Sequence, residues 1–434
     1  MKCQTHHIQT VKKRTFMKQI FLLLFITFSA SVFGQYENNI QKIIQLGDEW
    51  KFEEAIELLK DEISNDPQNP ELYYWLGRYS HYLVYDTRPF NNKSNLWSKE
   101  QVLKNLQKAV ELNPKYGDAK YFLAAEYGAR ALEALKTGDI KQYKKEFWDA
   151  KSWGGFPLHA IEYGRNILTS CDTNSILIVN GDAEYNILQY VQAIEGYRKD
   201  VSLVVIALLE RPYYIKLIRD GVPTICKPVP LNMNDNLVME MHNYKWREND
   251  IIIPVSEQTR QKYKLNDTLA HFIWHVKPNV GEKKLWTGTA MLINIIETNK
   301  WERPIHFTYF GSQNLEGLKD HLQIVGTTAR LIPMKVYGTK LEYDTIKFES
   351  VMFNPKNYID YHDIKNNNQP RVSYAYGQIC RRRIFDYAVY LYRNDKKKKA
   401  KKVLEIMEKL MPIEIHPLSS DIENGLDHLQ PRLK

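Results

Sequence analysis

The segment from Asn174 to Gly221 alternates twice between the pattern of a buried strand and the pattern of a helix. Ser175 to Val179 is a short apolar, β-branched run, and Ala183 to Glu195 places its apolar residues on one helical face. Val201 to Leu209 is again continuously apolar, as in parallel strands that are covered on both sides. The segment therefore predicts a parallel βαβ unit.

The first strand-to-helix junction holds three candidates for ligand binding, Gly181, Asp182 and Glu184. Loops after the carboxyl ends of parallel strands are where α/β folds bind ligands. In one interpretation, Asp182 only caps the helix by accepting hydrogen bonds from first-turn amides. In the other, both acids bind a hydroxyl-rich ligand or a cation, and Gly181 lets the backbone approach it. We favour the cap, which leaves Glu184 unexplained; Gly181 belongs to no GxGxxG or P-loop series.

Two separated blocks of this region resemble a known family. The matching residues of the first block are Gly181, Asp182, Tyr190, Gln192, Glu195, Gly196, Arg198, Asp200 and Val201. Those of the second block are Asn299, Lys300, Trp301, Arg303, Pro304, Ile305, Gly326, Leu331 and Pro333. The blocks are similar to the soluble region of large bacterial membrane proteins that resemble protein O-mannosyltransferases, although Ala183 and Glu184 depart from the pattern. The resemblance covers roughly residues 170 to 340, without the family's membrane-embedded catalytic part, so it implies no transferase activity.

The amino terminus has the features of a secretory signal. A charged start, Met17-Lys18-Gln19, precedes an apolar stretch from Ile20 to Phe28, and small residues follow up to Gly34. This stretch is too short to span a bilayer comfortably. We therefore expect residues 1–34 to be a leader and signal peptide, and the protein to be exported to the periplasm or cell envelope.

The net charge argues against a nucleic-acid partner, and the cysteine content argues against a disulfide framework or a cysteine zinc site. The chain has 60 Lys and Arg and 51 Asp and Glu, a net charge of +9 that falls to +4 without the five basic residues of the leader. We therefore expect no nucleic-acid partner. The cysteines after the leader are Cys171, Cys226 and Cys380, an odd number without CxxC spacing. Neither a disulfide framework nor a cysteine zinc site is expected.

Residues 35–170 have the pattern of paired helices. Phe52 to Leu59 and Leu72 to Tyr79, with a proline-containing stop between them, resemble a tetratricopeptide repeat. A second copy follows from Leu103 to Tyr127, and Gly138-Asp139 marks a further turn. The two copies are spaced more widely than such repeats, so Val84 to Asn95 is expected to be an inserted loop.

Residues 171–345 are predicted to form a Rossmann-like α/β domain with a mostly parallel sheet. A Pro- and Asn-rich insertion, Pro223 to Val280, is expected to form short antiparallel strands, one of them at Ile251 to Ile253. The remaining predicted elements are a helix at Lys284 to Thr298, a strand at Ile305 to Phe310 and a helix at Leu315 to Leu322.

The carboxyl-terminal part is predicted to be a linker at 346–372, a helical hairpin at 373–412 and a tail at 413–434. Arg381 to Arg383 and Lys396 to Lys402 lie on the two helices of this hairpin. We favour a solvated face for both groups. Contact of the Lys396 to Lys402 face with an anionic membrane surface is the alternative.

The remaining residue patterns predict neither a metal site nor a catalytic site. His271 and His275 have the spacing of zinc ligands on one helix face, but no glutamate follows His271 and no third ligand is evident, so no metal is expected. There is no GxSxG motif or Ser-His-Asp spacing, and we assign no catalytic residue and no cofactor. Arg303 is a fourth candidate for ligand binding, but we favour a salt bridge with an acid such as Asp182 over a substrate contact.

The predicted fold is therefore all-α plus α/β: tetratricopeptide-like hairpins, a Rossmann-like middle domain and a final helical hairpin. The predicted function is that of an exported, non-catalytic interaction or scaffold protein that binds a protein or peptide partner through its repeat helices. The alternative is a glycan-binding or glycan-processing accessory protein that uses Asp182 and Glu184.

Overall fold

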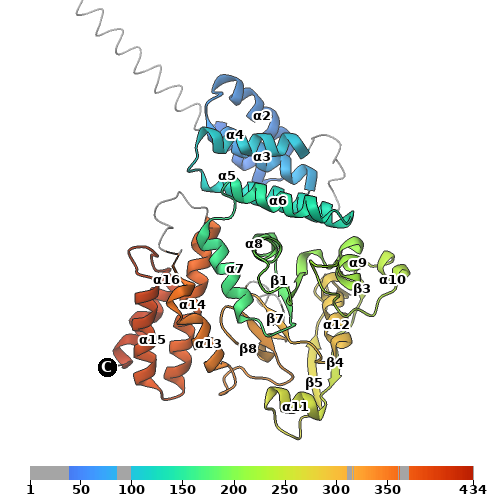
Figure 1. The fold of residues 1–434 in the computed structure, drawn as a ribbon, viewed down its shortest axis with the longest axis vertical. Helices are drawn as coiled ribbons and strands as arrows, with labels where there is room; N and C mark the ends of the chain where they lie inside the picture. Colours follow the sequence, from blue (N-terminus) through green and yellow to red (C-terminus); the bar gives the residue numbers. More distant parts are fainter. Residues whose placement is uncertain are drawn as a thin grey trace, which may run out of the picture. The chain divides into compact units, whose positions relative to one another are not determined.

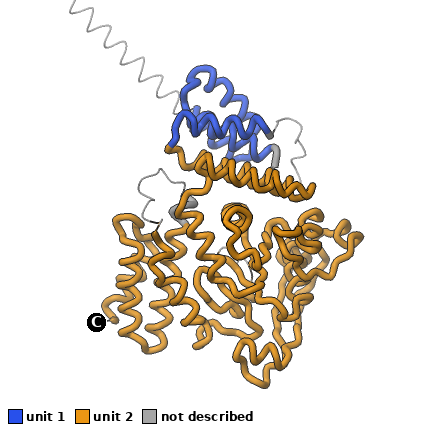
Figure 2. Tube along the Cα trace, in the orientation of Figure 1, with its two compact units in different colours: residues 1–114 blue, residues 115–434 orange. Residues whose placement is uncertain are grey.

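The structure is a computed structural model that describes residues 39–85, 99–309, 315, 317–359, 361 and 371–433. The chain divides into two compact units, residues 1–114 and residues 115–434 (Figure 2). The predicted signal peptide lies outside the described residues. The finer domain boundaries expected from the sequence stay predictions.

The first unit is helical. Its described part contains helical residues 39–48 and the helices α2 (Phe52–Asn65), α3 (Pro70–Tyr85) and α4 (Lys99–Leu112) (Figure 1). Because its apolar residues recur on one face, α2 buries Phe52, Ala55, Ile56 and Leu59. A Cβ atom at Gly77 of α3 would lie 2.6 Å from Cγ of Leu106 on α4, so glycine permits these helices to approach closely. The predicted helical hairpins are confirmed here, whereas most of the predicted loop Val84 to Asn95 lies outside the described residues.

The second unit begins with three helices, α5 (Gly117–Lys136), α6 (Ile140–Ser152) and α7 (Leu158–Ser170). The predicted turn between α5 and α6 is confirmed. Gly138 has a φ of 74°, and the Asp139 carboxylate caps α6 by accepting a hydrogen bond from the Gln142 amide at 2.9 Å. α7 leads directly to the sheet and packs against α8, α13 and α14 of the same unit.

A five-stranded mixed sheet forms the centre of this unit (Figure 1). Its strands are β1 (Ile176–Val179), β2 (Ser202–Val205), β7 (Ile305–Phe307), β8 (Leu322–Ile324) and β9 (Ala329–Leu331), in the order β2-β1-β7-β9-β8. β1 pairs in parallel with β2 and with β7, whereas β9 pairs antiparallel with β7 and β8. Helix α8 (Asp182–Ala193) joins β1 to β2. The predicted βαβ unit is confirmed. The expectation of a mostly parallel sheet is wrong, because two of the four strand pairs are antiparallel.

Two predicted elements of the sheet region are wrong in part. The apolar run Val201 to Leu209 is a strand only as far as Val205, and a 3-10 turn, η1 (Ile206–Leu208), follows. The helix expected at Leu315 to Leu322 is absent from the described residues there, which form turns, the short η3 (Lys319–His321) and the start of β8. Gly317 explains the interruption, because it has a φ of 77° and a Cβ atom on it would lie 2.7 Å from the carbonyl oxygen of His275.

The segment between β2 and β7 contains short elements and one longer helix. They are α9 (Pro212–Asp220), α10 (Asp235–Met239), β3 (Tyr244–Lys245), β4 (Asn249–Pro254), α11 (Glu257–Tyr263), β5 (His271–Val276), β6 (Lys284–Leu285) and α12 (Thr287–Asn299). The strand predicted at Ile251 to Ile253 is confirmed within β4, which pairs antiparallel with β5. α12 lies within the range predicted for a helix, apart from its last residue.

Helices complete the chain. They are α13 (Thr345–Met352), η4 (Pro355–Asn357), α14 (Arg371–Arg393), α15 (Lys397–Leu410), α16 (Ser420–Leu429) and η6 (Gln430–Leu433). The predicted hairpin is confirmed as α14 and α15, while α16 lies where only a tail was expected. Arg381 and Arg383 were expected on a solvated face, which is wrong: α14 packs against α7, α15 and α16, and these side chains are only 1% and 6% exposed.

Candidate functional site

Three of the four candidates for ligand binding, Gly181, Asp182 and Glu184, lie at the carboxyl edge of the parallel part of the sheet. β1 ends at Val179, and Asn180 and Gly181 lead into α8. β7 ends beside it, and the amide of Thr308 donates a hydrogen bond to the carbonyl of Ile178 at 3.0 Å. The chain leaves β1 towards β2 on one side, while β7 pairs on the other side. This edge is therefore the switch point at which open α/β sheets bind ligands.

Asp182 is not the cap that the sequence suggested. Gly181 occupies the N-cap position with an extended backbone and no side-chain cap, so Asp182 becomes the first helical residue. Its side chain is exposed, and none of the hydrogen bonds found among the described residues involves its carboxylate. Asp182 therefore contributes mainly a negative charge at the positive end of the helix dipole.

Glu184, by contrast, is directed into the protein and is only 3% exposed. Its Oε1 accepts a hydrogen bond of 2.7 Å from the hydroxyl of Tyr163 on α7, while its Oε2 has no hydrogen-bond partner within the described part of the chain. Burial raises the pKa of the Glu184 carboxyl, against the opposing effects of the Thr308 and Tyr163 hydroxyls and the charge of Arg383. Asp182 and Glu184 therefore do not form a pair of acids facing one ligand.

Residues far apart in the sequence surround Glu184. Tyr163 stacks on Tyr376 of α14, with ring centroids 4.4 Å apart and planes inclined by 16°. Arg383, also on α14, places its guanidinium 5.0 Å from the ring centroid of Tyr309, and its Nε and Nη2 atoms have no hydrogen-bond partner among the described residues. This buried polar cluster was not predicted from the sequence, which offers no local signal for it.

Arg303 lies at the opposite edge of the sheet, so the expected salt bridge with Asp182 is wrong. It precedes β7, and its guanidinium donates hydrogen bonds to the carbonyls of Asn174 (2.9 Å), Ser175 (3.0 Å) and Pro228 (2.8 Å). A fourth bond of 2.8 Å reaches the hydroxyl of Ser202 at the start of β2. Arg303 therefore fastens the amino-terminal ends of β1 and β2.

Arg198 and Asp200 of the first sequence block also make structural contacts. Arg198 donates hydrogen bonds to the carbonyls of Leu168, Cys171 and Asp172 at the end of α7, at distances of 2.7, 3.0 and 2.9 Å. It also forms an ion pair of 2.8 Å with Asp200. Arg198 thus binds both the carboxyl-terminal end of α7 and Asp200.

The two histidines with metal-ligand spacing lie on a strand rather than on a helix. β5 places His271 and His275 on its exposed face, since side chains two and four residues apart share one side of a strand. His275 lies 2.7 Å from Asp250 on the paired strand β4, and hydrogen bonds to Asp250 and Glu248 raise its pKa. The part of the chain that the structure describes contains no group of three or more His, Cys, Asp or Glu that could hold a metal ion.

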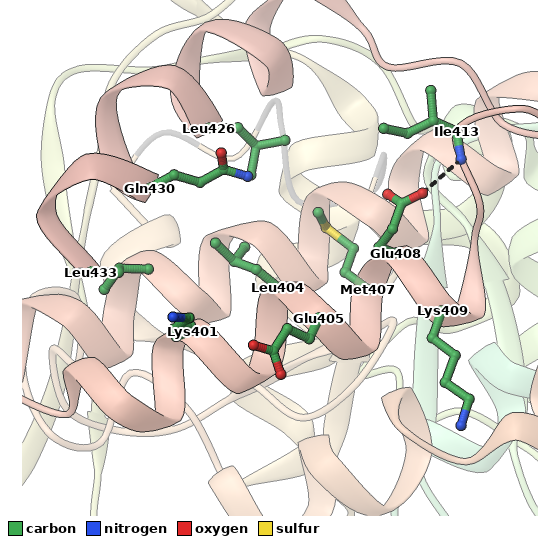
Figure 3. Close-up of a pocket in the computed structure, with 10 residues that line it drawn as sticks. All are labelled: Lys401, Leu404, Glu405, Met407, Glu408, Lys409, Ile413, Leu426, Gln430 and Leu433. Carbon is green, nitrogen blue, oxygen red and sulfur yellow. Dashed lines mark hydrogen bonds between the residues drawn. The ribbon is translucent and has the colours of Figure 1, made fainter.

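A groove of about 760 Å³ lies on the carboxyl-terminal helices (Figure 3). Its floor is apolar and comes from α15, α16 and η6: Leu404, Met407, Leu426 and Leu433. Its rim consists of Lys401, Glu405, Glu408, Lys409 and Gln430. At one end Ile413 is 43% exposed, and its amide donates a hydrogen bond of 3.0 Å to Glu408. α16 was not predicted, so this groove was not foreseen.

Comparison with known proteins identifies the middle of the chain. Residues 160–350 match TMEM260-associated domain 2, in two overlapping stretches, 160–283 and 248–350. The matched region runs from α7 into α13 and contains both sequence blocks and Glu184, whereas the groove lies beyond it. The comparison with curated proteins finds no match.

Proposed function

We propose that the protein is an exported, non-catalytic interaction or scaffold protein of the cell envelope that binds a protein or peptide partner through its helical hairpins. The observation that carries this proposal is the groove between α15, α16 and η6. An apolar floor enclosed by a charged rim suits the side chains of a docked peptide segment, which gain burial on the floor and hydrogen bonds or ion pairs at the rim.

The hairpins of the first unit support the same function. The packing of α3 on α4 through Gly77 resembles that of tetratricopeptide repeats, which present grooves to peptides. The signal-like pattern of residues 1–34 supports a location in the envelope. The described helices include none with the length and hydrophobicity needed to cross a membrane.

Site-specific photo-crosslinking tests this function. A photoreactive amino acid replaces Glu405 on the groove rim in one protein and exposed Lys319, away from α15 and α16, in the matched control. We expect the Glu405 position alone to crosslink a discrete envelope protein. The purified partner should bind the wild type and should bind a Gln430→Trp variant, in which the indole obstructs the groove, much less tightly. Identical products from both positions, or none from Glu405, would contradict the proposal.

A second candidate function is glycan binding at the carboxyl edge of a Rossmann-like fold. The buried Oε2 of Glu184 without a hydrogen-bond partner, next to the stacked rings of Tyr163 and Tyr376, favours it. The resemblance to proteins related to O-mannosyltransferases supports the ligand class by analogy only. A mannoside or polyprenyl-phosphate sugar present at a hundred times its Kd should stabilise the protein by about 2.7 kcal/mol. Thermal shifts with wild type and Glu184→Gln test this, and no shift with any sugar would remove the candidate.

A further inference from the structure

One edge of the groove is bordered by lysines that have no acidic partner. Lys398, Lys401 and Lys402, here called the lysine stripe, are exposed, and within the described residues none of them forms an ion pair. Their neighbour Lys399 differs, because it pairs with Glu349 at 2.5 Å. The stripe therefore presents positive charge that is not neutralised by the chain.

Helical geometry places this charge along the groove rather than away from it. Residues 398, 401, 402 and 405 follow the i, i+3, i+4, i+7 spacing of one helical stripe. Lys401 and Glu405 both line the groove (Figure 3). The same helical spacing therefore places Lys398 and Lys402 beside its rim. The stripe occupies the first two turns of α15, where the helix dipole adds further positive potential.

The acidic rim residues offset only part of this charge. Glu408 is already engaged, since its carboxylate accepts the Ile413 amide hydrogen. Glu405 and Lys409 also line the groove, and their opposite charges add up to zero. The excess of positive charge therefore lies at the end of the groove formed by the amino-terminal half of α15.

We propose that the groove binds an acidic amphipathic helix of a partner protein, a proposal that rests on the function proposed above. Apolar side chains of that helix, spaced three and four residues apart, contact the floor formed by Leu404, Met407, Leu426 and Leu433. Its Glu and Asp side chains lie over the lysine stripe. Charge complementarity of this kind sets the orientation of the partner and accelerates binding.

The shape of the site favours a helix over an anionic membrane. A bilayer surface attracts lysines but is flat on the scale of one helix, whereas the floor residues Leu404 and Leu433 are only 9% and 8% exposed beneath the rim. Side chains that project from a partner helix reach such a floor, and lipid headgroups do not. The lysine stripe and the apolar floor are thus used together only by a peptide ligand.

The test uses the full mature chain and two synthetic probes, a fluorescent amphipathic helical peptide with glutamates on its polar face and the same peptide with lysines there. We expect the acidic peptide to bind, and binding to weaken with added salt. The triple variant Lys398→Glu, Lys401→Glu and Lys402→Glu should bind it about tenfold more weakly or worse, since each exposed pair contributes modestly. A control triple with the same charge change at exposed Lys245, Lys283 and Lys319 should bind as the wild type does.

Each other outcome overturns the inference in a recognisable way. If Gln430→Trp abolishes peptide binding but charge reversal has no effect, or if the lysine peptide binds equally well, the groove binds peptides without the proposed selectivity and the function stands. If neither peptide binds and groove crosslinks are also absent, both proposals fail. If the stripe variant loses binding only to vesicles containing phosphatidylglycerol, the lysines serve a membrane surface. Circular dichroism of each variant confirms that the helices are intact.

Discussion

At the residue scale, Asp182 and Glu184 occupy opposite environments although one residue separates them. An α-helix turns by about 100° per residue, so positions two apart point to different sides. The Asp182 side chain is exposed to solvent, whereas Glu184 contacts Tyr163 in the interior. Substitutions at the two positions should therefore have different consequences for stability.

Asp182 should be sensitive to charge and insensitive to shape. Because its carboxylate makes no cap, Asp182→Asn and Asp182→Ala should lower the free energy of unfolding by the same small amount, about 0.3–1 kcal/mol, through loss of the favourable dipole interaction. Urea unfolding at low ionic strength measures this. A loss confined to the alanine variant would show that the side chain caps α8 after all.

Glu184 should make stability depend on pH. Burial raises the pKa of its carboxyl, so its contribution is fully present below the unfolded-state pKa of about 4.3 and is lost as pH rises through the folded-state pKa. Glutamine cannot ionise and still accepts the Tyr163 hydrogen bond. We therefore expect Glu184→Gln to be more stable than the wild type at pH 7 and to lose that advantage near pH 4. Thermal melting of both proteins between pH 4 and pH 7 measures this difference, with Glu302→Gln at an exposed position as the control. A stability advantage of Glu184→Gln that is independent of pH would contradict the prediction.

At the element scale, arginines hold the amino edge of the parallel strands. Arg303 donates hydrogen bonds to the start of β1, the start of β2 and the segment at Pro228. Arg198 donates hydrogen bonds to carbonyls at the end of α7. Carbonyls at this edge lie where strands and helix end, so few backbone donors are available to them. The planar guanidinium of Arg303 has five donors in a fixed fork and reaches four acceptors here, whereas an ammonium has three donors on a single nitrogen.

Replacing Arg303 should accordingly loosen the sheet edge. Arg303→Ala leaves several polar acceptors unsatisfied, each at about 1–3 kcal/mol when buried, and we expect a total loss of about 2–4 kcal/mol with partial relief from water. Arg303→Lys should retain only a minor part of the stability that Arg303→Ala loses. Hydrogen exchange should show faster exchange in β1 and β2 but not in α15. Equal stability of the lysine variant and the wild type would show that charge alone, rather than the planar fork, holds this edge.

At the scale of the whole molecule, periodic elements were predictable and long-range neighbours were not. The βαβ unit and the hairpin of α14 and α15 could be predicted because strand and helix geometry impose a regular spacing on their buried apolar residues. α16 carries the same signal in Ile422, Leu426 and Leu429, but over only ten residues. The surroundings of Glu184 had no such signal, because the contact between Tyr376 and Ala183 joins positions 193 residues apart. Arg383 looked like part of a surface charge run, and only the packing of α14 buries it.

An ion-pair network around Asp172 ties several of these distant elements together within the second unit. Asp172 follows α7 and lies 3.1 Å from His306 on β7, 2.9 Å from Arg330 on β9 and 3.2 Å from Lys347 on α13. Burial alone would raise the pKa of the Asp172 carboxyl, but the hydrogen bond with His306 and the neighbouring positive charges hold it well below its usual range. The carboxylate thus pairs with cations from two elements, Arg330 of β9 and Lys347 of α13, and contacts His306, whose pKa is lowered by burial.

Removing that carboxylate should destabilise the unit more than any change at Asp182. Asp172→Asn keeps the shape but leaves Arg330 and Lys347 without their counter-charge. We expect a loss of about 3 kcal/mol at pH 7, at the low end for a broken buried pair because Asp172 is partly exposed. Since the pKa of Asp172 is lowered on folding, its contribution is present above the unfolded-state value of about 3.9 and is lost as pH falls below it. The difference between wild type and variant should therefore shrink in acid. Urea unfolding at pH 7, 5 and 3 measures this difference in unfolding free energy, with Asp267→Asn at an exposed position as the control. A difference that stays constant to pH 3 would show that the network contributes through hydrogen bonding rather than through charge.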